Sequence, residues 1–580
     1  MIRSTEIDTR PRRPPFPHCS VPFPYWLGFS GYLVDAEGGC SCLQTVSLAV
    51  LGSSGIGKSA FMAALADRLF ARNTLRQRPV VLRHCGLTAE SSDGLGLVRS
   101  ICMQIQYTLG LTCDQRSVPS SYKAAVGRLR SLLRRHPVIL LLDGVDRLVD
   151  LHGAYSELSF LVGVRPHPFT RVVVSTALEG TVILDDDEET HNYCTMEPPR
   201  RSVARASEVG DNCVRKLLVH GVRPIQLPDR WSDVGALSQL RGALRRRNRR
   251  LTPAQWEFVG QQAVGEFNTL HLALSSFILG KWPSTMKPDC TGGTLESGGW
   301  GFDMRSDTDE LLHRILSKVG RECGPVITKA AIGFLTFSRY GLSDNELMDL
   351  LTLRTDVAVE VYGKAGKFRP PFHCWLRVRS RLGDLLVDGP GGRILWTNKK
   401  CAEWSASWFS DEERRGMCRL MAEYFGNLLD KEETSRLHVM RHKIVLSGGP
   451  SLDESLLNRR RCQEAAVHMF SSSMLREARA ELCRITSVYA YAKTHSMCMY
   501  VHYLGKLAGH PLLSKDARVI AYYKWLRDGR KALFGPHVRV TDFRAHLSGL
   551  GEGSILASDI RGFLVKYVSH GRPVLICANI

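Results

Sequence analysis

The stretch Gly52-Ser53-Ser54-Gly55-Ile56-Gly57-Lys58-Ser59 has the residue types and the spacing of a phosphate-binding loop. In the pattern Gly-x-x-x-x-Gly-Lys-Ser, the glycines let backbone N–H groups turn inward around phosphate oxygens. The Lys58 ammonium can reach the β- and γ-phosphates of a nucleotide, and the Ser59 hydroxyl can bind Mg²⁺. We therefore expect Gly52 to Ser59 and the adjoining Ala60 to bind nucleotide phosphates, with Lys58 also acting in catalysis.

The residues on both sides of this loop predict the elements that must position it. Val46 to Leu51 is a continuous apolar run, which is typical of a buried parallel strand. After the loop, Phe61, Leu65 and Leu69 recur at helical spacing, and the N-terminus of this helix adds a partial positive charge at the phosphates. The alternative is a chance glycine-rich turn, and the order of strand, loop and helix argues against it.

A second candidate group is the pair of carboxylates that follows the apolar run from Val138 to Leu142. Such a run predicts a buried strand that delivers Asp143 at its C-terminal end, where ligands bind in open α/β sheets. We expect Asp143 to hold Mg²⁺ through water, because Mg²⁺ keeps most of its waters and takes few carboxylates. Asp146 could polarise the attacking water of a hydrolysis reaction, although a structural role in a turn is nearly as well supported.

A third candidate is Ser175, which lies in the run from Arg171 to Thr176. The valines of this run predict a further core strand, and two hydroxyl residues end it. We expect Ser175 to lie beside the γ-phosphate, where a hydroxyl can respond to the presence of that group. The alternative is a strand that merely ends in polar residues.

The composition describes a large, basic, globular chain. Its 580 residues are enough for about three or four domains, and the 44% apolar fraction is normal for globular protein. The formal net charge of +20 allows binding to nucleic acid, to an acidic membrane surface or to an acidic partner, or a merely solvated basic surface. The sharpest basic run, Arg245 to Arg250, lacks the interleaved aromatic residues of a single-strand binding platform.

The cysteines and the apolar runs predict where the chain resides. The 17 cysteines are scattered and form no Cys-x-x-Cys pair, so we expect reduced thiols and neither a zinc ribbon nor a disulfide framework. No apolar signal-peptide core and no run of 18 apolar residues is visible. We therefore expect a cytoplasmic protein without a transmembrane segment.

The order of the predicted elements indicates several domains. We expect an α/β P-loop NTPase with a three-layer parallel sheet, followed by a helical lid, a winged-helix-like domain and an all-α C-terminal domain. Thr252 and Pro253 predict a capped helix start in the lid, and Ser343 with Glu346 predicts a capping box in the winged-helix-like domain. The expected boundaries are 1–42 for a Pro/Arg-rich arm, 43–235 for the NTPase with an acidic insertion near 183–212, 236–305 for the lid, 306–410 for the winged-helix-like domain, 411–545 for the helical domain and 546–580 for a tail.

Several stretches together resemble the NACHT and WD-repeat proteins, close to the telomerase-associated and nephrocystin-type members of the STAND class of signalling ATPases. Their order and spacing are more specific than any single motif, and the likeness runs from about residue 44 to about residue 430. The stretches are Gly55-Ile56-Gly57-Lys58-Ser59, Arg83 to Asp93 with Leu97 to Ile105, Leu142 to Leu148 with Val173 to Thr176, Gly341 to Leu347, and Arg369 to Pro371 with Trp375 to Arg379.

The resemblance implies a nucleotide-operated switch. ATP or dATP, with Mg²⁺, would bind between the α/β domain and the lid plus winged helix, and exchange or slow hydrolysis would expose a surface for self-association or protein partners. Two stretches depart from the family pattern. Asn268-Thr269-Leu270 stands where Asn-Pro-Leu is usual, and Asn398-Lys399-Lys400-Cys401 stands where His-Arg-Gln-Phe is usual. No Gly-His…Trp-Asp repeat occurs, so we expect a divergent short member or an incomplete gene product without its propeller.

Three functions remain open from the sequence. The first is the STAND-type regulatory ATPase described above. The second is an origin-recognition-like ATPase that binds nucleic acid through its basic surface and winged helix, which is possible but not favoured because no clear basic recognition helix is visible. The third is a degenerate scaffold that holds ADP without turnover. The absence of an Asn-Lys-x-Asp motif favours adenine over guanine as the base.

Overall fold

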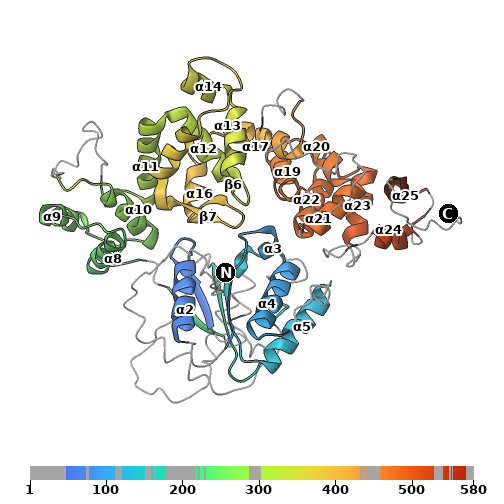
Figure 1. Ribbon diagram of the computed structural model, residues 1–580, viewed down its shortest axis with the longest axis horizontal. Coiled ribbons are helices and arrows are strands. Elements are labelled where there is room, and N and C mark those ends of the chain that lie inside the picture. The colour runs from blue at the N-terminus through green and yellow to red at the C-terminus, as the bar shows by residue number, and fades with distance from the viewer. Residues whose placement is uncertain are drawn as a thin grey trace, which may run out of the picture.

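The computed structural model places a parallel sheet beneath three groups of helices (Figure 1). It describes residues 48–72, 78–111, 121–149, 154, 158–161, 165–177, 217, 222–227, 230–285, 302–430, 437, 458–494, 496–527, 538, 540–547, 550–551 and 553–569. The predicted N-terminal arm, the acidic insertion near 183–212 and the glycine-rich break from 292 to 301 lie outside the described residues. The sheet region is defined here as 48–227, the lid region as 230–285, the wing region as 302–410 and the C-terminal region as 411–569.

The sheet region contains five parallel strands in the order β2-β3-β4-β1-β5. The three inner strands of this order are apolar because both faces of the sheet are covered, so nearly all of their side chains are buried. The strands are β1 (Leu48–Gly52), β2 (Val80–His84), β3 (Ile139–Asp143), β4 (Arg171–Ala177) and β5 (Arg223–Gln226), and the helices are α2 (Lys58–Arg72), α3 (Ala89–Ser92), α4 (Gly94–Thr108), α5 (Tyr122–Arg135) and the 3-10 turn η3 (Val145–Arg147).

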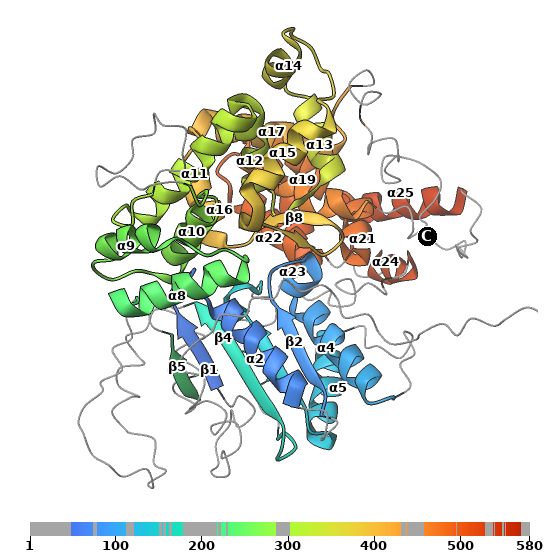
Figure 2. The ribbon, with the colours of Figure 1, turned by 60° about the vertical axis from the view of Figure 1, so that its left-hand side comes forward.

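Two separate hydrophobic cores flank this sheet. The alternate residues Leu48 and Val50 pack with α2 on one face, whereas Ala49 and Leu51 pack in a larger core with α4 and α5 on the other. Figures 1 and 2 show α2 on one side of the sheet and α4 with α5 on the opposite side. The predicted three-layer α/β architecture is confirmed.

The lid region is a group of three helices, α8 (Asp233–Arg246), α9 (Pro253–Gln262) and α10 (Thr269–Gly280). The predicted start of α9 is confirmed, since the Thr252 side chain accepts a hydrogen bond from the backbone N–H of Gln255 and Pro253 occupies the first turn. The boundary that we drew at residue 235 falls inside α8. The capping side chain of Asn268 begins α10, whose buried face joins the core of the next region.

The wing region contains helices with a small antiparallel sheet of order β6-β8-β7. The predicted capping box of Ser343 with Glu346 is confirmed at the start of α13. The elements are α11 (Thr308–Cys323), α12 (Pro325–Phe337), β6 (Leu342–Ser343), α13 (Asp344–Thr352), α14 (Thr355–Tyr362), α15 (Phe372–Leu382), the 3-10 turn η6 (Gly383–Leu385), β7 (Leu386–Gly389), β8 (Arg393–Trp396) and α16 (Lys399–Ala406).

Every regular element that the structure describes in the C-terminal region is a helix, as predicted for residues 411–545. A single core of buried residues continues from Trp231 in the lid region to Leu564, so the lid, wing and C-terminal regions share it. The helices are α17 (Asp411–Gly426), α19 (Arg459–Ser471), α20 (Leu475–Leu482), α21 (Ile485–Lys493), α22 (Met497–Gly509), α23 (Ala517–Arg527), α24 (Val540–Leu547) and α25 (Ile555–Ser569).

Two local predictions differ from the structure. The helix expected from Trp375 to Leu386 ends at Leu382, because Gly383 has a φ of 48° and leaves the helical conformation. The glycine-rich tail expected after residue 545 contains the 15-residue helix α25 instead. Leu556, Ile560, Phe563 and Leu564 of α25 are buried at helical spacing, so packing outweighs the low helix propensity of the glycines nearby.

Candidate functional site

The strand order brings the predicted site residues to one edge of the sheet. All five strands are parallel, so their C-terminal ends lie on the same side, facing the helical regions (Figure 2). β4 lies between the strand that leads into the phosphate-binding loop and the strand that ends in Asp143. The register pairs Gly52 with Ala177 and Leu142 with Val174, which places Ser175 between the loop and Asp143.

The phosphate-binding loop runs from Gly52 at the end of β1 to Lys58 at the start of α2. Gly55 and Gly57 have φ values of 92° and 106°, which side chains with a Cβ rarely adopt. The Lys58 ammonium donates to the carbonyl oxygens of Gly52, at 2.7 Å, and Ser53, at 2.8 Å. These bonds hold Lys58 across the loop, so its charge lies where phosphate oxygens would bind between the loop and the N-terminus of α2.

Asp143 is the best-supported carboxylate of the site. It is 3% exposed, and its Oδ1 accepts a hydrogen bond from Ser175 Oγ at 2.6 Å, while its Oδ2 lies 2.9 Å from Nδ1 of His84. Burial raises the pKa of Asp143. Hydrogen bonds from His84, Ser175 and Ser59 lower it by more, so the pKa lies below its ordinary value and the group is a carboxylate at neutral pH. An ionised carboxylate only accepts, so the His84 Nδ1 carries the proton of that bond.

The Ser59 hydroxyl and the Asp143 carboxylate are the residues predicted to hold Mg²⁺, and Ser59 lies close enough to lower the pKa of Asp143. One hydroxyl and one carboxylate fit Mg²⁺, which takes few protein oxygens and completes its octahedron with waters and phosphate oxygens. Within the described ranges no cluster of three or more His, Cys, Asp or Glu residues could hold a metal ion.

The side chains of Asp146 and Ser175 both form hydrogen bonds within the protein at this edge of the sheet. Asp146 lies in the 3-10 turn after β3, and its Oδ1 accepts from the backbone N–H of Ala177 at 3.0 Å, which ties this turn to the end of β4. Ser175 is fully buried, donates to Asp143 and accepts from the Gly144 backbone N–H at 2.9 Å. The catalytic function of Asp146 and the γ-phosphate contact of Ser175 both stay predictions.

The lid region contacts the phosphate-binding loop through the start of α10. A methyl group on Gly57 would lie 3.7 Å from Cγ2 of Thr269, and one on Gly55 would lie 3.7 Å from Cδ2 of Leu270. The Thr269 side chain is fixed by a hydrogen bond, since Trp231 Nε1 donates to its Oγ1 at 3.1 Å. The stretch Asn268-Thr269-Leu270, in which threonine stands where proline is usual in the family that the sequence resembles, therefore contacts the phosphate-binding loop.

The wing region contacts the same loop through the start of α16. A methyl group on Gly55 would lie 3.3 Å from Cγ of Lys400 and 3.8 Å from Nδ2 of Asn398. Asn398 caps α16, because its Oδ1 accepts from the Lys400 backbone N–H at 2.9 Å. The second stretch that departs from the family pattern is thus also at the site, where the stem of Lys400 contacts the loop and its ammonium pairs with Glu403 at 2.9 Å.

His84 is a site residue that sequence reasoning missed. It ends β2, pairs in register with Asp143 and is partly exposed, with 28% of its side chain accessible. A signal was present, because a polar residue at the C-terminal end of a predicted parallel strand lies at the ligand-binding edge. The contact itself depends on β2 and β3 being neighbours, which the local sequence does not specify.

Comparisons with known proteins give one consistent relationship. No family model matches the chain. The chain is 24% identical to human NACHT domain- and WD repeat-containing protein 1 over 469 residues, 76% of this chain and 27% of that protein. It is 22% identical to human NACHT and WD repeat domain-containing protein 2, over 65% of this chain and 20% of that protein. Mouse telomerase protein component 1 is 30% identical over 114 residues, 18% of this chain and 4% of that protein.

The structural comparison adds little to this. The solved structure of Cdc6p from Pyrobaculum aerophilum aligns with 63% of this chain and 88% of its own at 12% identity, with a TM-score of 0.26, which is too low to support a shared arrangement. The chain spans about a quarter or less of the length of its curated relatives. Within that span, the phosphate-binding loop, the buried Asp143 and the parallel sheet support a nucleotide-binding NTPase, and the alignments show a NACHT-family relationship for this chain.

Proposed function

We propose that this chain is a nucleotide-operated switch, which binds ATP with Mg²⁺, hydrolyses it slowly and thereby controls self-association or the assembly of a scaffold. One observation carries the proposal: the phosphate-binding loop is contacted by the lid region and the wing region at once, through Thr269, Leu270, Asn398 and Lys400. A ligand on the loop would therefore change contacts that join three regions of the chain.

The electrostatics of this junction suit an anion. α2, α10 and α16 all begin at the loop, so three helix N-termini direct partial positive charge toward one place. The ammonium of Lys58 adds a full charge. A triphosphate carries more negative charge than a diphosphate, so the two nucleotides would stabilise the junction to different extents. A ligand shifts a two-state equilibrium only through such a difference in affinity.

The residue functions follow from their positions. Gly52 to Ser59, with Ala60, would bind the phosphates, and Lys58 would neutralise charge on the transferred phosphoryl group. Bound Mg²⁺ would supply further charge neutralisation, with Ser59 and Asp143 holding it and with His84 and Ser175 orienting the Asp143 carboxylate. Asp146 would orient the attacking water through its Oδ2, while its Oδ1 is held by the Ala177 N–H and fixes the carboxylate in one orientation.

The domain boundaries and the location remain proposals alongside the function. The segments 43–235, 236–305, 306–410 and 411–545 are proposed to act as NTPase, lid, winged-helix-like and helical domains. Among the helices that the structure describes, none combines the length and the apolar character that a membrane span requires. A cytoplasmic location is proposed because ATP and reducing conditions are found there.

The test combines nucleotide identification with measurement of assembly state. The full chain is purified, its bound nucleotide is extracted and identified, and its mass in solution is measured with ADP and with a non-hydrolysable ATP analogue. Co-purified adenine nucleotide and a larger species with the analogue are expected. Lys58→Ala should remove both effects, whereas Lys123→Ala, an exposed lysine on α5, should keep both.

Two results would contradict parts of the proposal. Absence of bound nucleotide and of any mass change, in the wild type as well as in Lys58→Ala, would refute the switch. Retained ADP with no turnover and no change of assembly would point to a nucleotide-stabilised scaffold, in which the ligand contributes only binding energy to the folded state.

A further inference from the structure

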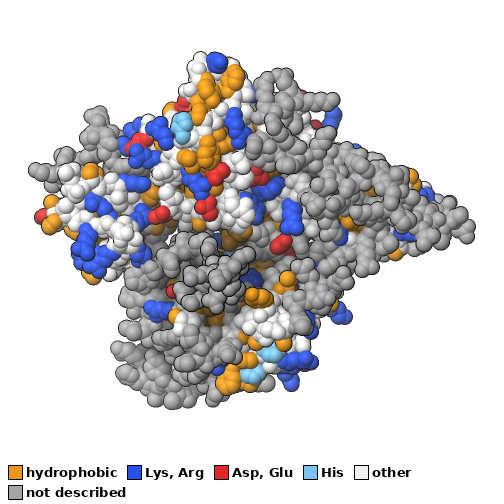
Figure 3. Space-filling view, in the orientation of Figure 1, with side chains coloured by type: hydrophobic (Ala, Val, Ile, Leu, Met, Phe, Trp, Pro, Cys, Tyr) orange, Lys and Arg blue, Asp and Glu red, His pale blue; other side chains and the backbone are white. Residues whose placement is uncertain are grey.

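The outer end of the wing region, away from the sheet, exposes an unusual concentration of apolar side chains. Of fifteen large hydrophobic residues exposed in the described ranges, five lie between residues 359 and 376. Figure 3 shows hydrophobic side chains gathered over α14, with Lys and Arg at their borders. We name these five residues the α14–α15 ridge: they are Val359 (48% exposed), Tyr362 (42%), Phe368 (40%), Phe372 (46%) and Leu376 (44%).

The part of the ridge around Tyr362 is held by its own contacts. Val359 and Tyr362 share one face of α14, and Phe372 and Leu376 share one face of α15. Tyr362 and Phe368 pack edge to face at 5.9 Å between ring centroids, and the Tyr362 hydroxyl donates to the Arg369 carbonyl at 2.6 Å. Aromatic rings held in this way expose apolar area that loses little conformational entropy on binding.

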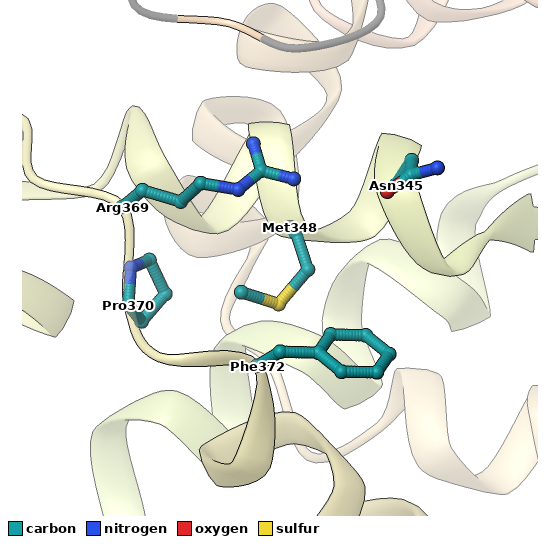
Figure 4. Close-up of a pocket in the computed structure, with 5 residues that line it drawn as sticks. All are labelled: Asn345, Met348, Arg369, Pro370 and Phe372. Carbon is teal, nitrogen blue, oxygen red and sulfur yellow. The ribbon is translucent and has the colours of Figure 1, made fainter.

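A pocket of about 340 Å³ opens beside the ridge. Figure 4 shows Arg369 and Phe372 on opposite sides of Met348, with Pro370 at one end and Asn345 at the other. Met348 is buried at the base of this pocket, and methionine adapts its shape to varied apolar groups. The pocket is of a size for one or two side chains, and Asn345 and Arg369 supply polar groups that can bind a peptide backbone or a carboxylate.

The charge around the ridge is positive, although most of its arginines form ion pairs within the protein. Residues 354–381 contain seven Lys and Arg residues and two acidic residues. Both acids are turned toward the protein: Glu360 accepts from the backbone N–H groups of Val326 and Ile327 at 2.9 and 2.7 Å, and Asp356 pairs with Arg354. Carboxylates outside this segment also pair with its arginines: Asp349 with Arg369, Asp344 and Asp388 with Arg379, and Glu322 with Arg381. The exposed Lys364 lies 5.0 Å from the Phe368 ring, so it places a positive charge directly beside the apolar surface.

We propose that this pocket and the α14–α15 ridge bind a peptide segment of a partner protein, in which acidic residues flank an aromatic or aliphatic side chain. The apolar side chain would occupy the pocket over Met348, and the flanking carboxylates would lie near Lys364 and Lys367, since Arg369 already pairs with Asp349. Charge complementarity favours this partner over a second copy of the chain, whose net charge is +20. A concave pocket with polar ends fits a peptide better than a flat lipid surface.

The experiment is a selection of random twelve-residue peptides displayed on phage against the full chain. Peptides enriched on the wild type should carry acidic residues on both sides of an apolar one. A fluorescent synthetic copy of the most enriched peptide should bind at least tenfold more weakly to Phe372→Ser. It should bind severalfold more weakly to the double variant Lys364→Glu, Lys367→Glu, with a difference that shrinks as salt increases.

The matched control is Leu512→Ser, because Leu512 is 79% exposed in another region and should not affect the peptide. Near-ultraviolet circular dichroism and nucleotide binding show whether each variant is folded. No enrichment over Phe372→Ser, or enrichment of peptides without acidic residues, would overturn the proposal. So would wild-type binding to phosphatidylserine vesicles, or wild-type dimerisation, that Phe372→Ser abolishes while no peptide is selected.

Discussion

The sheet region and the C-terminal region each bury a carboxylate beside a histidine, and they hold it in different ways. Asp143 ends β3 and is 3% exposed, with His84 Nδ1 at 2.9 Å. Glu464 lies within α19 and has no exposed surface, with His468 Nε2 at 3.1 Å. Both groups are ionised, because hydrogen bonds and positive charge outweigh the cost of burial.

The partners of the two carboxylates differ in how easily they can be exchanged. Glu464 accepts from the backbone N–H groups of Arg339 and Tyr340, at 3.0 and 3.1 Å, and from Arg460 at 3.0 Å. These bonds join α19 to the end of α12, within the core that the lid, wing and C-terminal regions share. Burial raises the pKa of Glu464, but Arg460 and its other partners lower it to about 2.

Asp143 is instead held by two hydroxyls and a partly exposed histidine. Such partners can rotate or change their contacts without moving the backbone, so Asp143 can accept a new partner at low cost. The comparison suggests a distinction between two kinds of buried carboxylate. A fully buried carboxylate bonded to backbone N–H groups holds two elements together, whereas one bonded to exchangeable side chains at the edge of a sheet is available for ligand binding. The comparison also predicts that the sheet region moves relative to a helical block, in which lid, wing and C-terminal regions stay together.

The largest expected effect is on stability, and it should separate the two carboxylates. Glu464→Gln removes a fully buried carboxylate that pairs with Arg460, whose side chain is 21% exposed and also pairs with Glu346, so we expect a cost of roughly 3 kcal/mol, the lower end of the range for a broken buried ion pair. We expect a melting temperature lower by about 6 °C or more. Asp143→Asn should cost about 1 kcal/mol or less, since its neighbours can form other hydrogen bonds. Differential scanning calorimetry measures the melting temperature of each variant. Equal losses of stability in Glu464→Gln and Asp143→Asn would contradict the distinction between the two carboxylates.

The next effect is on nucleotide affinity. Lys58→Ala removes hydrogen bonds from a charged group to phosphate, each worth about 1.5–3 kcal/mol, so affinity should fall by about ten- to a hundredfold. Isothermal titration calorimetry with ATP measures it. Lys123→Ala is the control and should keep the wild-type affinity for ATP, because Lys123 lies exposed on α5. Unchanged affinity for Lys58→Ala would remove the phosphate-binding assignment from the loop.

Much of the sheet edge could be predicted from sequence because its signals are local. The glycine spacing of the loop, the apolar run before Asp143 and the valines before Ser175 each specify an element and its end. The helix starts at Thr252 and Ser343 were predictable for the same reason, since a capping box spans four residues.

The contacts between residues that are distant in the sequence could not be predicted in this way. The approach of Lys400 to Gly55 and the pairing of His84 with Asp143 join residues that are far apart in the chain, and both depend on packing and strand order. Glu464 gave no signal at all, because a glutamate within an arginine-rich helix ordinarily indicates a solvated face. Only the buried contacts with residues 339 and 340 distinguish it.

A pH series tests whether Glu464 is as strongly ionised as its contacts indicate. Its folded-state pKa of about 2 lies below its ordinary value of 4.5, so its stabilising contribution is present above pH 4.5 and is lost as the pH falls toward 2. The stability difference between wild type and Glu464→Gln should therefore be constant from pH 7 to pH 5 and shrink below that. Urea unfolding at several pH values measures it, and a difference that grows in acid would have the wrong sign.

The smallest expected effect concerns the exchangeable carboxylate. If Asp143 holds Mg²⁺ together with Ser59, Asp143→Asn should bind ATP within about twofold of the wild type when Mg²⁺ is chelated, because the phosphates still reach the loop and Lys58. Added Mg²⁺ should then strengthen binding severalfold in the wild type and scarcely in the variant, as calorimetric titrations with and without chelator would record. Asp67→Asn is the matched control. Asp67 is an exposed carboxylate on α2, eight residues after Ser59, so this variant should keep the wild-type response to Mg²⁺. A variant at position 143 that responds to Mg²⁺ like the wild type would leave Asp143 as a second structural carboxylate, and the distinction between the two regions would then rest on Lys58 alone.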